Sequence, residues 1–217
     1  MSLNLLKKTI CMKEVRQLND TADCLTFIKE LTAKMDKALE KKRFSHTLAV
    51  ATTASCMAMR YDCDANRAYI AGLLHDNAKC LDNDKKLSIC KKYNIPVNDA
   101  EAKNPDLLHA KVGSILAKEK YKIEDEEIIS SIRWHTTGKP NMTALEKIIY
   151  IADYIEPLRK KQSNMDEVRK LAFTDLDACM MKILAGTIQY LTEKNATIDQ
   201  VTMETYQFYK QLCEERK

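Results

Sequence analysis

Glycine and proline are both scarce in this chain, which has only four of each in 217 residues. These two residues mark many of the turns in proteins, so their scarcity favours long helices over many short strands. No stretch alternates convincingly between apolar and polar residues with a period of two, as a half-buried strand would. The sequence therefore predicts an all-α fold, and a hydrophobic content of 45% indicates a globular protein.

None of the eight cysteines forms a Cys-x-x-Cys pair, so the usual signal of a zinc ribbon or a thioredoxin-type site is missing. Residues 1–20 hold no long apolar run, and we expect neither a secretory signal nor a membrane span. We therefore expect a cytoplasmic protein whose cysteines are mostly reduced core residues. A net charge of +4 is too balanced to indicate a nucleic-acid surface, although it allows a local basic pocket.

The chain has no Gly/Ser linker, low-complexity segment or internal repeat, so we expect a single domain at 24–217 after an N-terminal extension at 1–23. Ser45 is the expected N-cap of one helix, and Thr143 with Glu146 resembles a capping box. Apolar periodicity and caps predict helices over 23–40, 43–58, 64–74, 84–93, 106–119, 124–134, 145–156, 165–173, 175–191 and 197–214.

Two predicted helices are apolar on nearly every side, and each carries charged or polar residues. One ends in His75 and Asp76, and the other contains Asp153. An ionised carboxylate is costly to bury unless it is paired or bound to a metal, so both aspartates need a partner.

The four histidines are His46, His75, His109 and His135. A lone histidine at a helix start is more often a cap or a surface residue than a ligand. Together, however, His46, His75, Asp76 and Asp153 offer two imidazoles and two carboxylates from separate helices. This set suits iron(II), manganese or cobalt with open coordination positions, and zinc less well. Such an ion lowers the pKa of bound water and makes it a nucleophile.

The order His46, His75-Asp76, Asp153 resembles the signature of HD-domain phosphohydrolases. The stretches 134–138 (Trp-His-Thr-Thr-Gly) and 152–157 (Ala-Asp-Tyr-Ile-Glu-Pro) narrow the match to the YqeK-type group. That group hydrolyses diadenosine tetraphosphate symmetrically to two ADP. The resemblance runs from about Met35 to the C-terminus, and it implies an HD-domain helical bundle.

By this resemblance, one or two divalent ions, iron first and manganese or cobalt as substitutes, are held by His46, His75, Asp76 and Asp153. His109 and His135 would then bind phosphate or a second metal, or protonate the leaving oxygen, and Lys79 would contact a phosphate or a metal ligand. The resemblance places Arg43, Asp76, His109, His135, Thr136, Arg159, Lys194, Asn195, Ala196, Thr197, Ile198 and Asp199 against the substrate.

The implied reaction is attack of a metal-activated water on an inner phosphate, with a nucleoside diphosphate leaving. The partners are then a dinucleoside polyphosphate and ADP, with no nucleic acid and no membrane, and a homodimer is compatible with the sequence. Three alternatives stay open: another HD-type nucleotide phosphohydrolase, a non-catalytic nucleotide-binding regulatory module, and a helical adaptor whose histidines are core residues. The Trp-His-Thr-Thr-Gly stretch argues against the first, and the complete set of four ligands argues against the second.

Overall fold

Helices joined by turns and short loops make up the computed structural model, which describes residues 21–159 and 164–216. No β-strand occurs within those ranges, and the all-α prediction is confirmed. The elements in chain order are α1 (Thr21–Ala38), α2 (Lys41–Arg60), α3 (Ala65–Leu74), α4 (Asn83–Lys92), α5 (Asp99–Lys103), the 3-10 helix η2 (Pro105–Leu108), α6 (His109–Glu119), α7 (Glu126–Trp134), α8 (Ala144–Ile155), α9 (Met165–Leu171), α10 (Leu176–Glu193) and α11 (Gln200–Glu214).

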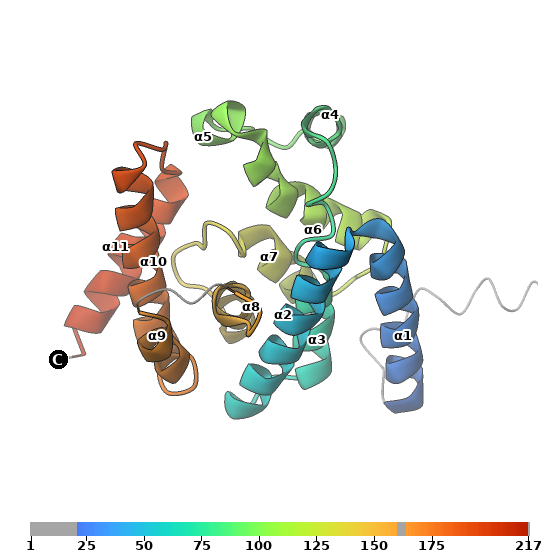
Figure 1. Cartoon of the computed structure of the whole chain (residues 1–217), viewed down its shortest axis with the longest axis horizontal. Coiled ribbons are helices and arrows are strands. Elements are labelled where there is room, and N and C mark those ends of the chain that lie inside the picture. The colour runs from blue at the N-terminus through green and yellow to red at the C-terminus, as the bar shows by residue number, and fades with distance from the viewer. Residues whose placement is uncertain (1–20, 160–163, 217) are drawn as a thin grey trace, which may run out of the picture.

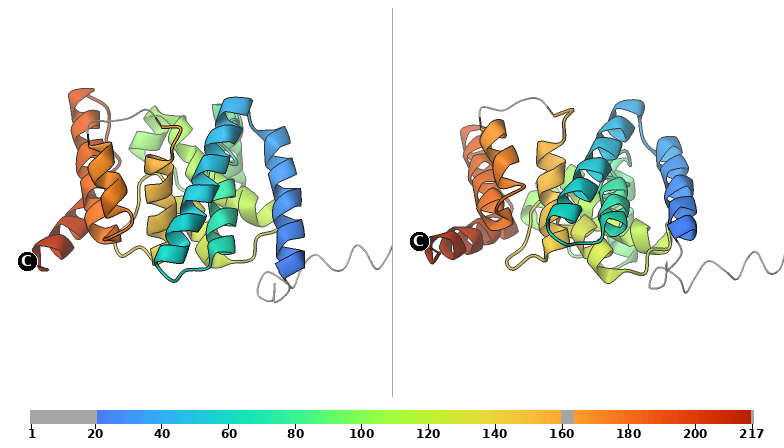
Figure 2. Two further views of the ribbon diagram at one scale, coloured as in Figure 1. Left: turned by 60° about the horizontal axis from the view of Figure 1, so that its bottom comes forward. Right: turned by 90° about the horizontal axis from the view of Figure 1, so that it is seen from below.

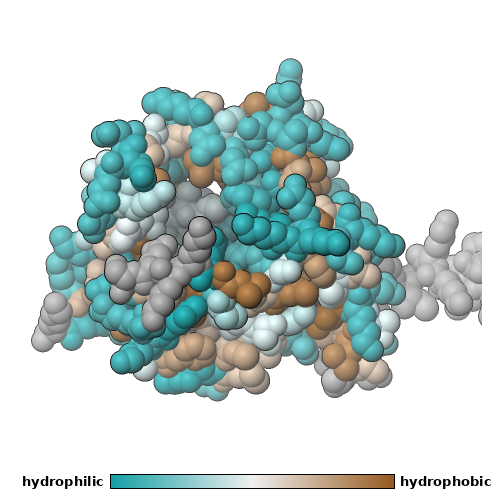
Figure 3. Space-filling model, in the orientation of Figure 1, coloured by the Kyte–Doolittle hydropathy of each residue, from teal (hydrophilic) through white to brown (hydrophobic). Residues whose placement is uncertain are grey.

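Helices α2, α3, α7 and α8 form the centre of the molecule (Figure 1). Helix α1 covers one side of this centre, and α9, α10 and α11 stand together on the other side, where α10 packs on α8 (Figure 2). Helices α4 and α5 lie at one end of the bundle with η2 and α6. Hydrophilic side chains cover most of the face seen in Figure 3, with smaller hydrophobic patches between them.

The helix starts follow local capping in most cases. Asp64 accepts hydrogen bonds from two backbone N–H groups of α3, and Thr143 with Glu146 forms the predicted capping box of α8. The prediction for Ser45 was wrong. Helix α2 begins earlier, at Lys41, and the Ser45 hydroxyl instead donates to the Lys41 carbonyl inside the helix.

Two further helix boundaries differ from the prediction. The helix expected over 106–119 is divided, because Pro105 starts the 3-10 turn η2 and α6 follows from His109. The helix expected over 197–214 starts at Gln200, because Asp199 caps it and Asn195 adopts a positive φ of 51°. Residues 1–20 of the predicted N-terminal extension lie outside the described residues, and the boundary between 23 and 24 stays a prediction.

Helices α2 and α3 approach each other very closely at Gly72. A Cβ built on Gly72 would lie 2.7 Å from the Ala51 Cα, and no real Cβ fits at that distance. Ala51, Ala54 and Ala58 on the facing side of α2 are fully buried, as the small residues of this helix predicted. The missing side chain therefore sets the distance between the two helices that carry His46 and His75.

The prediction that the cysteines are mostly core residues was wrong. Of the seven described cysteines, only Cys24, Cys90 and Cys179 are buried, whereas Cys56 and Cys80 are exposed and the other two are half-buried. Cysteine is small enough to be tolerated on exposed helix faces, and composition alone does not reveal which face a residue occupies. Cys11 lies outside the described residues.

Candidate metal centre

Six side chains from separate helices and turns converge between α2, α3, α7 and α8. His46 comes from α2 and Asp153 from α8, while His109 is the first residue of α6. His75 and His135 each follow the last residue of a helix, α3 and α7 respectively. Asp76, His75, His109 and His135 are at most 3% exposed, and His46 is 8% exposed.

Asp76 divides the cluster into two halves, because its two oxygens face different histidines. Its Oδ2 lies 3.7 Å from His46 Nε2 and 3.4 Å from His75 Nε2. Its Oδ1 lies 3.3 Å from His109 Nε2 and 3.7 Å from His135 Nε2. The carboxylate therefore stands between two pairs of imidazoles.

Asp153 completes the first half. Its Oδ1 lies 3.0 Å from His46 Nε2 and 3.7 Å from His75 Nε2. The second half is closed by a distance of 3.2 Å between His109 Nε2 and His135 Nε2. Two sets of ligand atoms are each compact enough to hold an ion, namely His46 with His75 and Asp153, and His75 with Asp76 and His135, and the two sets share His75.

The Nδ1 atom of every histidine in the cluster faces a hydrogen-bond acceptor. Three of these acceptors are the carbonyls three residues earlier: Gly72 at 2.6 Å from His75, Asp106 at 2.6 Å from His109, and Ile132 at 2.7 Å from His135. His46 Nδ1 lies 3.0 Å from the Glu156 carboxylate. We therefore assign the proton to Nδ1 in each ring, which leaves a lone pair on each Nε2.

The Nε2 lone pairs are oriented for binding a cation and cannot form hydrogen bonds with one another. His46 Nε2 and His75 Nε2 are buried without a hydrogen-bond partner. With the proton on Nδ1, His46 Nε2 faces the Asp153 oxygen at 3.0 Å as acceptor against acceptor. Buried acceptors that face each other are unfavourable unless a positive charge lies between them. The geometry and the mixed nitrogen and oxygen donors both suit a divalent transition-metal ion.

The buried charges shift the acidities of the cluster. Burial lowers the pKa of His46, but the carboxylates of Asp153 and Glu156 outweigh it and the net pKa is raised. Burial and the neighbouring His135 lower the pKa of His109 to about 3, so this ring is neutral.

Two arginines pair with the aspartates of the cluster. Arg43 donates to Asp76 Oδ2 at 2.8 Å, and Arg159 donates to Asp153 Oδ1 at 2.6 Å. Their side chains are 32% and 42% exposed, so each guanidinium also reaches solvent. Guanidinium forks with free N–H groups at the edge of a metal site suit phosphate oxygens.

Lys79 lies beside the second half of the cluster. Its Nζ donates to Asp106 Oδ2 at 2.6 Å and stands 3.5 Å from His109 Nδ1. Asp106 also accepts from the almost fully buried Lys86 at 2.9 Å. Burial raises the pKa of Asp106, but the two lysines outweigh it and lower the pKa to about 2.

The predicted nucleotide-binding residues lie at two places. Thr136 borders the cluster and lines a cavity of about 270 Å³ together with Asp153 and Arg159. The predicted stretch 194–199 forms the connection between α10 and α11, and 194–197 is exposed there. Asp199, in contrast, is buried, and it shares a second cavity, of about 210 Å³, with Thr136.

Glu156 was missed by the sequence analysis. It is 1% exposed, contacts His46 through Oε1 and accepts from the Leu158 backbone N–H through Oε2. Its position in the sequence could have indicated it, because Glu156 lies three residues after Asp153, at the end of an apolar helix and directly before Pro157.

Residues 43–158, slightly more than half of the chain, match the family model described as HD domain. The chain belongs to the HD-domain family. The six residues of the cluster all lie within this matched HD domain, and so do Arg43 and Lys79.

Proteins named symmetrical bis(5'-nucleosyl)-tetraphosphatase are similar to this HD-domain chain over most of its length. The one from Bacillus subtilis is 39% identical over 82% of this chain and 94% of its own length. The one from Staphylococcus aureus is 36% identical over 79% of this chain and 88% of its own length.

A solved structure from Clostridium acetobutylicum has a similar fold. It is described as a predicted HD superfamily hydrolase involved in NAD metabolism, with a TM-score of 0.81 and 39% identity. The match covers 87% of this chain and 97% of that chain.

Proposed function

We propose that this protein hydrolyses diadenosine tetraphosphate symmetrically to two molecules of ADP. The observation that carries the proposal is the similarity, at 36–39% identity over most of the chain, to proteins named for this reaction. The cluster of four histidines and two aspartates supports it, because the cluster provides the ligands that a metal-dependent hydrolase needs.

Within this proposal, His46, His75, Asp76 and Asp153 hold one divalent ion, and Asp76, His109 and His135 hold a second. The orientation of the Asp76 oxygens toward different histidine pairs supports two ions rather than one. Iron is the proposed metal, since imidazole and carboxylate donors suit it, and manganese or cobalt would substitute. When bound, the ions supply Lewis acidity and lower the pKa of a coordinated water.

The chain's own residues hold the substrate. Arg43 and Arg159 stand at the edge of the cluster, where they neutralise phosphate charge that grows in the transition state. Thr136 lines the adjoining cavity, where its hydroxyl is the group proposed to bind phosphate oxygens. Lys79 adds a positive charge near His109, and Asp106 holds it in place.

The test is to incubate the purified protein with diadenosine tetraphosphate and a divalent metal and to separate the products. ADP as the only product supports the proposal, whereas ATP with AMP would rule out symmetric cleavage. The variant Asp76→Ala is expected to lose turnover and bound metal, because both halves of the cluster share this carboxylate. Asp36→Ala, on an exposed face of α1, is the matched control.

The number of ions is tested separately by elemental analysis of metal-loaded protein. Wild-type protein is expected to hold two ions per chain and His109→Ala one, because this histidine belongs to the second half alone. Equal metal content in the two proteins would contradict the second ion.

A further inference from the structure

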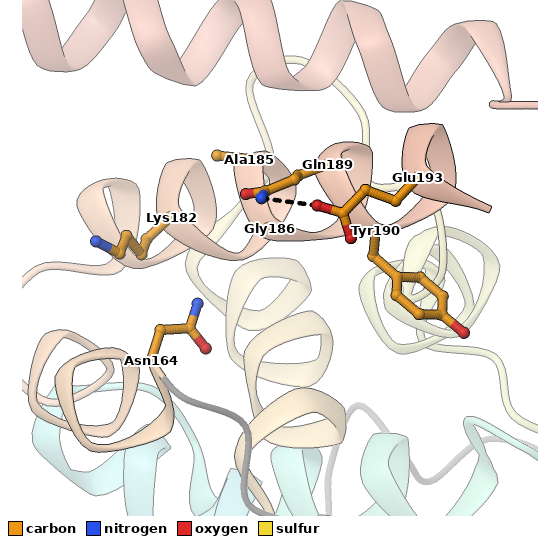
Figure 4. Close-up of a pocket in the computed structure, with 7 residues that line it drawn as sticks. All are labelled: Asn164, Lys182, Ala185, Gly186, Gln189, Tyr190 and Glu193. Carbon is orange, nitrogen blue, oxygen red and sulfur yellow. Dashed lines mark hydrogen bonds between the residues drawn. The ribbon is translucent and has the colours of Figure 1, made fainter. Parts of the chain in front are cut away.

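A groove runs from the metal centre along α10, and three adjoining cavities define it. The cavity of about 270 Å³ beside the centre shares Tyr154 and Thr187 with a second cavity of about 400 Å³. The second cavity shares Gly186 and Tyr190 with a third, of about 450 Å³. We call the second and third cavities the α10 groove, and Figure 4 shows the residues that line its far part.

The packing of the described residues does not require a glycine at position 186. Gly186 lies in the interior of α10, where glycine weakens a helix relative to alanine. Among the described residues, a Cβ built there would meet only the Asn164 amide nitrogen, at an ordinary contact distance of 3.5 Å. Gly72 differs, because its place leaves no room for a Cβ. Glycine is also used where a ligand comes close to the backbone, and Gly186 lines the α10 groove.

The groove combines an aromatic ring with polar groups. Tyr190 is a large apolar side chain with an exposed fraction of 58%, and it lines both cavities of the groove. Asn164 projects toward α10 from the opposite wall, while Gln189 and Glu193 pair at 2.9 Å on α10 (Figure 4). An aromatic face for stacking, with amides and a carboxylate beside it, suits a nucleobase and ribose hydroxyls.

We propose that the α10 groove binds the second nucleoside of the dinucleoside polyphosphate, with its base stacked on Tyr190. This inference rests on the proposed function. Symmetric cleavage places a nucleoside diphosphate on each side of the broken bond, so the substrate extends from the centre in two arms of equal size. The stretch 194–199 is predicted to hold one arm, and the groove opens from the cavity at the metal centre to receive the other. Asp199, at one end of this stretch, shares a cavity with Thr136, whereas Lys194, at the other end, borders the groove with its Nζ 6.0 Å from the centroid of the Tyr190 ring.

The first test compares diadenosine tetraphosphate with adenosine 5'-tetraphosphate, which has a single nucleoside. Tyr190→Ala and Gly186→Leu are expected to raise the KM for diadenosine tetraphosphate about tenfold, within the range that loss of one stacked base produces. The KM for adenosine 5'-tetraphosphate should change less than about twofold, since its nucleoside can use the other arm. Phe173→Ala, which removes an exposed aromatic outside the groove, is the matched control.

The second test counts bound ADP by equilibrium dialysis of the metal-loaded protein. Two ADP per chain are expected for the wild type and one for Tyr190→Ala. An unchanged KM in both groove variants, an equal rise for the two substrates, or two ADP in Tyr190→Ala would overturn the groove as a subsite. Absence of wild-type cleavage of diadenosine tetraphosphate would instead overturn the proposed function, and the ADP count separates the two failures.

Discussion

At the scale of single residues, the four histidines are oriented in two different ways. His75 and His135 directly follow the last residues of α3 and α7, and His109 directly follows η2, so that each Nδ1 lies against the carbonyl three residues earlier. His46 lies inside α2, where the carbonyls are used by the helix itself. It therefore needs an acceptor from outside, and Glu156 is that acceptor.

This difference gives a prediction for Glu156. Glu156→Ala leaves the His46 ring without its acceptor, and we expect the affinity for Mn²⁺ to fall about 10- to 100-fold, as for other residues that orient metal-binding histidines. Glu156→Gln keeps an acceptor oxygen without the charge, so its affinity should lie between those of Glu156→Ala and the wild type. Isothermal titration calorimetry with Mn²⁺ measures the effect.

Glu167→Ala is the control, because its side chain is exposed on α9 and pairs with Lys182. Mn²⁺ affinity within about twofold of the wild type in Glu156→Ala would show that His46 keeps its orientation without the carboxylate.

The sequence indicated which residues form the cluster better than it indicated what orients them. Asp76 and Asp153 could be predicted because a carboxylate in an apolar helix is costly and implies a partner. Glu156 carries the same charge, but at the end of a helix it resembles an ordinary surface residue. The backbone carbonyl acceptors leave no trace in the side-chain sequence, so only the structure reveals them.

At the scale of the helices, the close contact between α2 and α3 predicts that adding one methyl group at Gly72 destabilises the protein. Gly72→Ala gains helix propensity but drives its Cβ into the Ala51 backbone, and we expect a net loss of about 1–3 kcal/mol in the free energy of unfolding. Gly186→Ala makes the same change in α10, where the Cβ has space. It should stabilise the protein by up to about 1 kcal/mol.

Chemical denaturation of both variants beside the wild type measures these effects. Stabilisation of equal size in Gly72→Ala and Gly186→Ala would show that α2 and α3 can separate without cost.

The start of a helix could be predicted where the capping residue bonds only to its own first turn. Asp64 and the Thr143–Glu146 pair act within one turn of their own helices, so their residue types sufficed. Ser45 has the same local preference, yet the helix begins one turn earlier, where Phe44 packs against the core and Arg43 pairs with Asp76. The short helix α5 was not predicted, since five residues carry too little periodicity.

At the scale of the whole molecule, buried carboxylates join helices that are distant in sequence. Asp177, in the first turn of α10, accepts from Lys147 of α8 at 2.7 Å and from Arg216 at 2.5 Å. Burial raises the pKa of Asp177, but the two cations outweigh it and hold the pKa below the usual 3.8. Because the folded protein has the lower pKa, this stabilisation is present above pH 3.8 and is lost as the pH falls through the folded value.

The variant Asp177→Asn tests whether the ion pairs of Asp177 stabilise the fold. We expect it to be less stable than the wild type by about 1.5–3 kcal/mol at pH 7, the range for hydrogen bonds to charged groups. The difference should stay constant down to about pH 5 and shrink below pH 4, as urea denaturation at several pH values would show. Asp36→Asn is the control, and a difference for Asp177→Asn that persists unchanged to pH 2 would exclude the ion pair as its cause.

None of the helices in residues 21–159 and 164–216 combines the length and the apolar character needed to cross a lipid bilayer. Cytoplasmic location, the homodimer and the extent of the domain at 24–217 stay predictions. These properties depend on surfaces and partners, about which apolar periodicity carries little information.

The contact at Gly72 also affects how α2 and α3 unfold locally. Two helices that meet without an intervening side chain cannot slide past each other, so α2 and α3 should open and close as one cooperative unit. Amide hydrogens on either side of the contact would then exchange with solvent at a common rate. His46 and His75 would be lost together in such an opening, and any ion bound between them would slow the exchange of both helices.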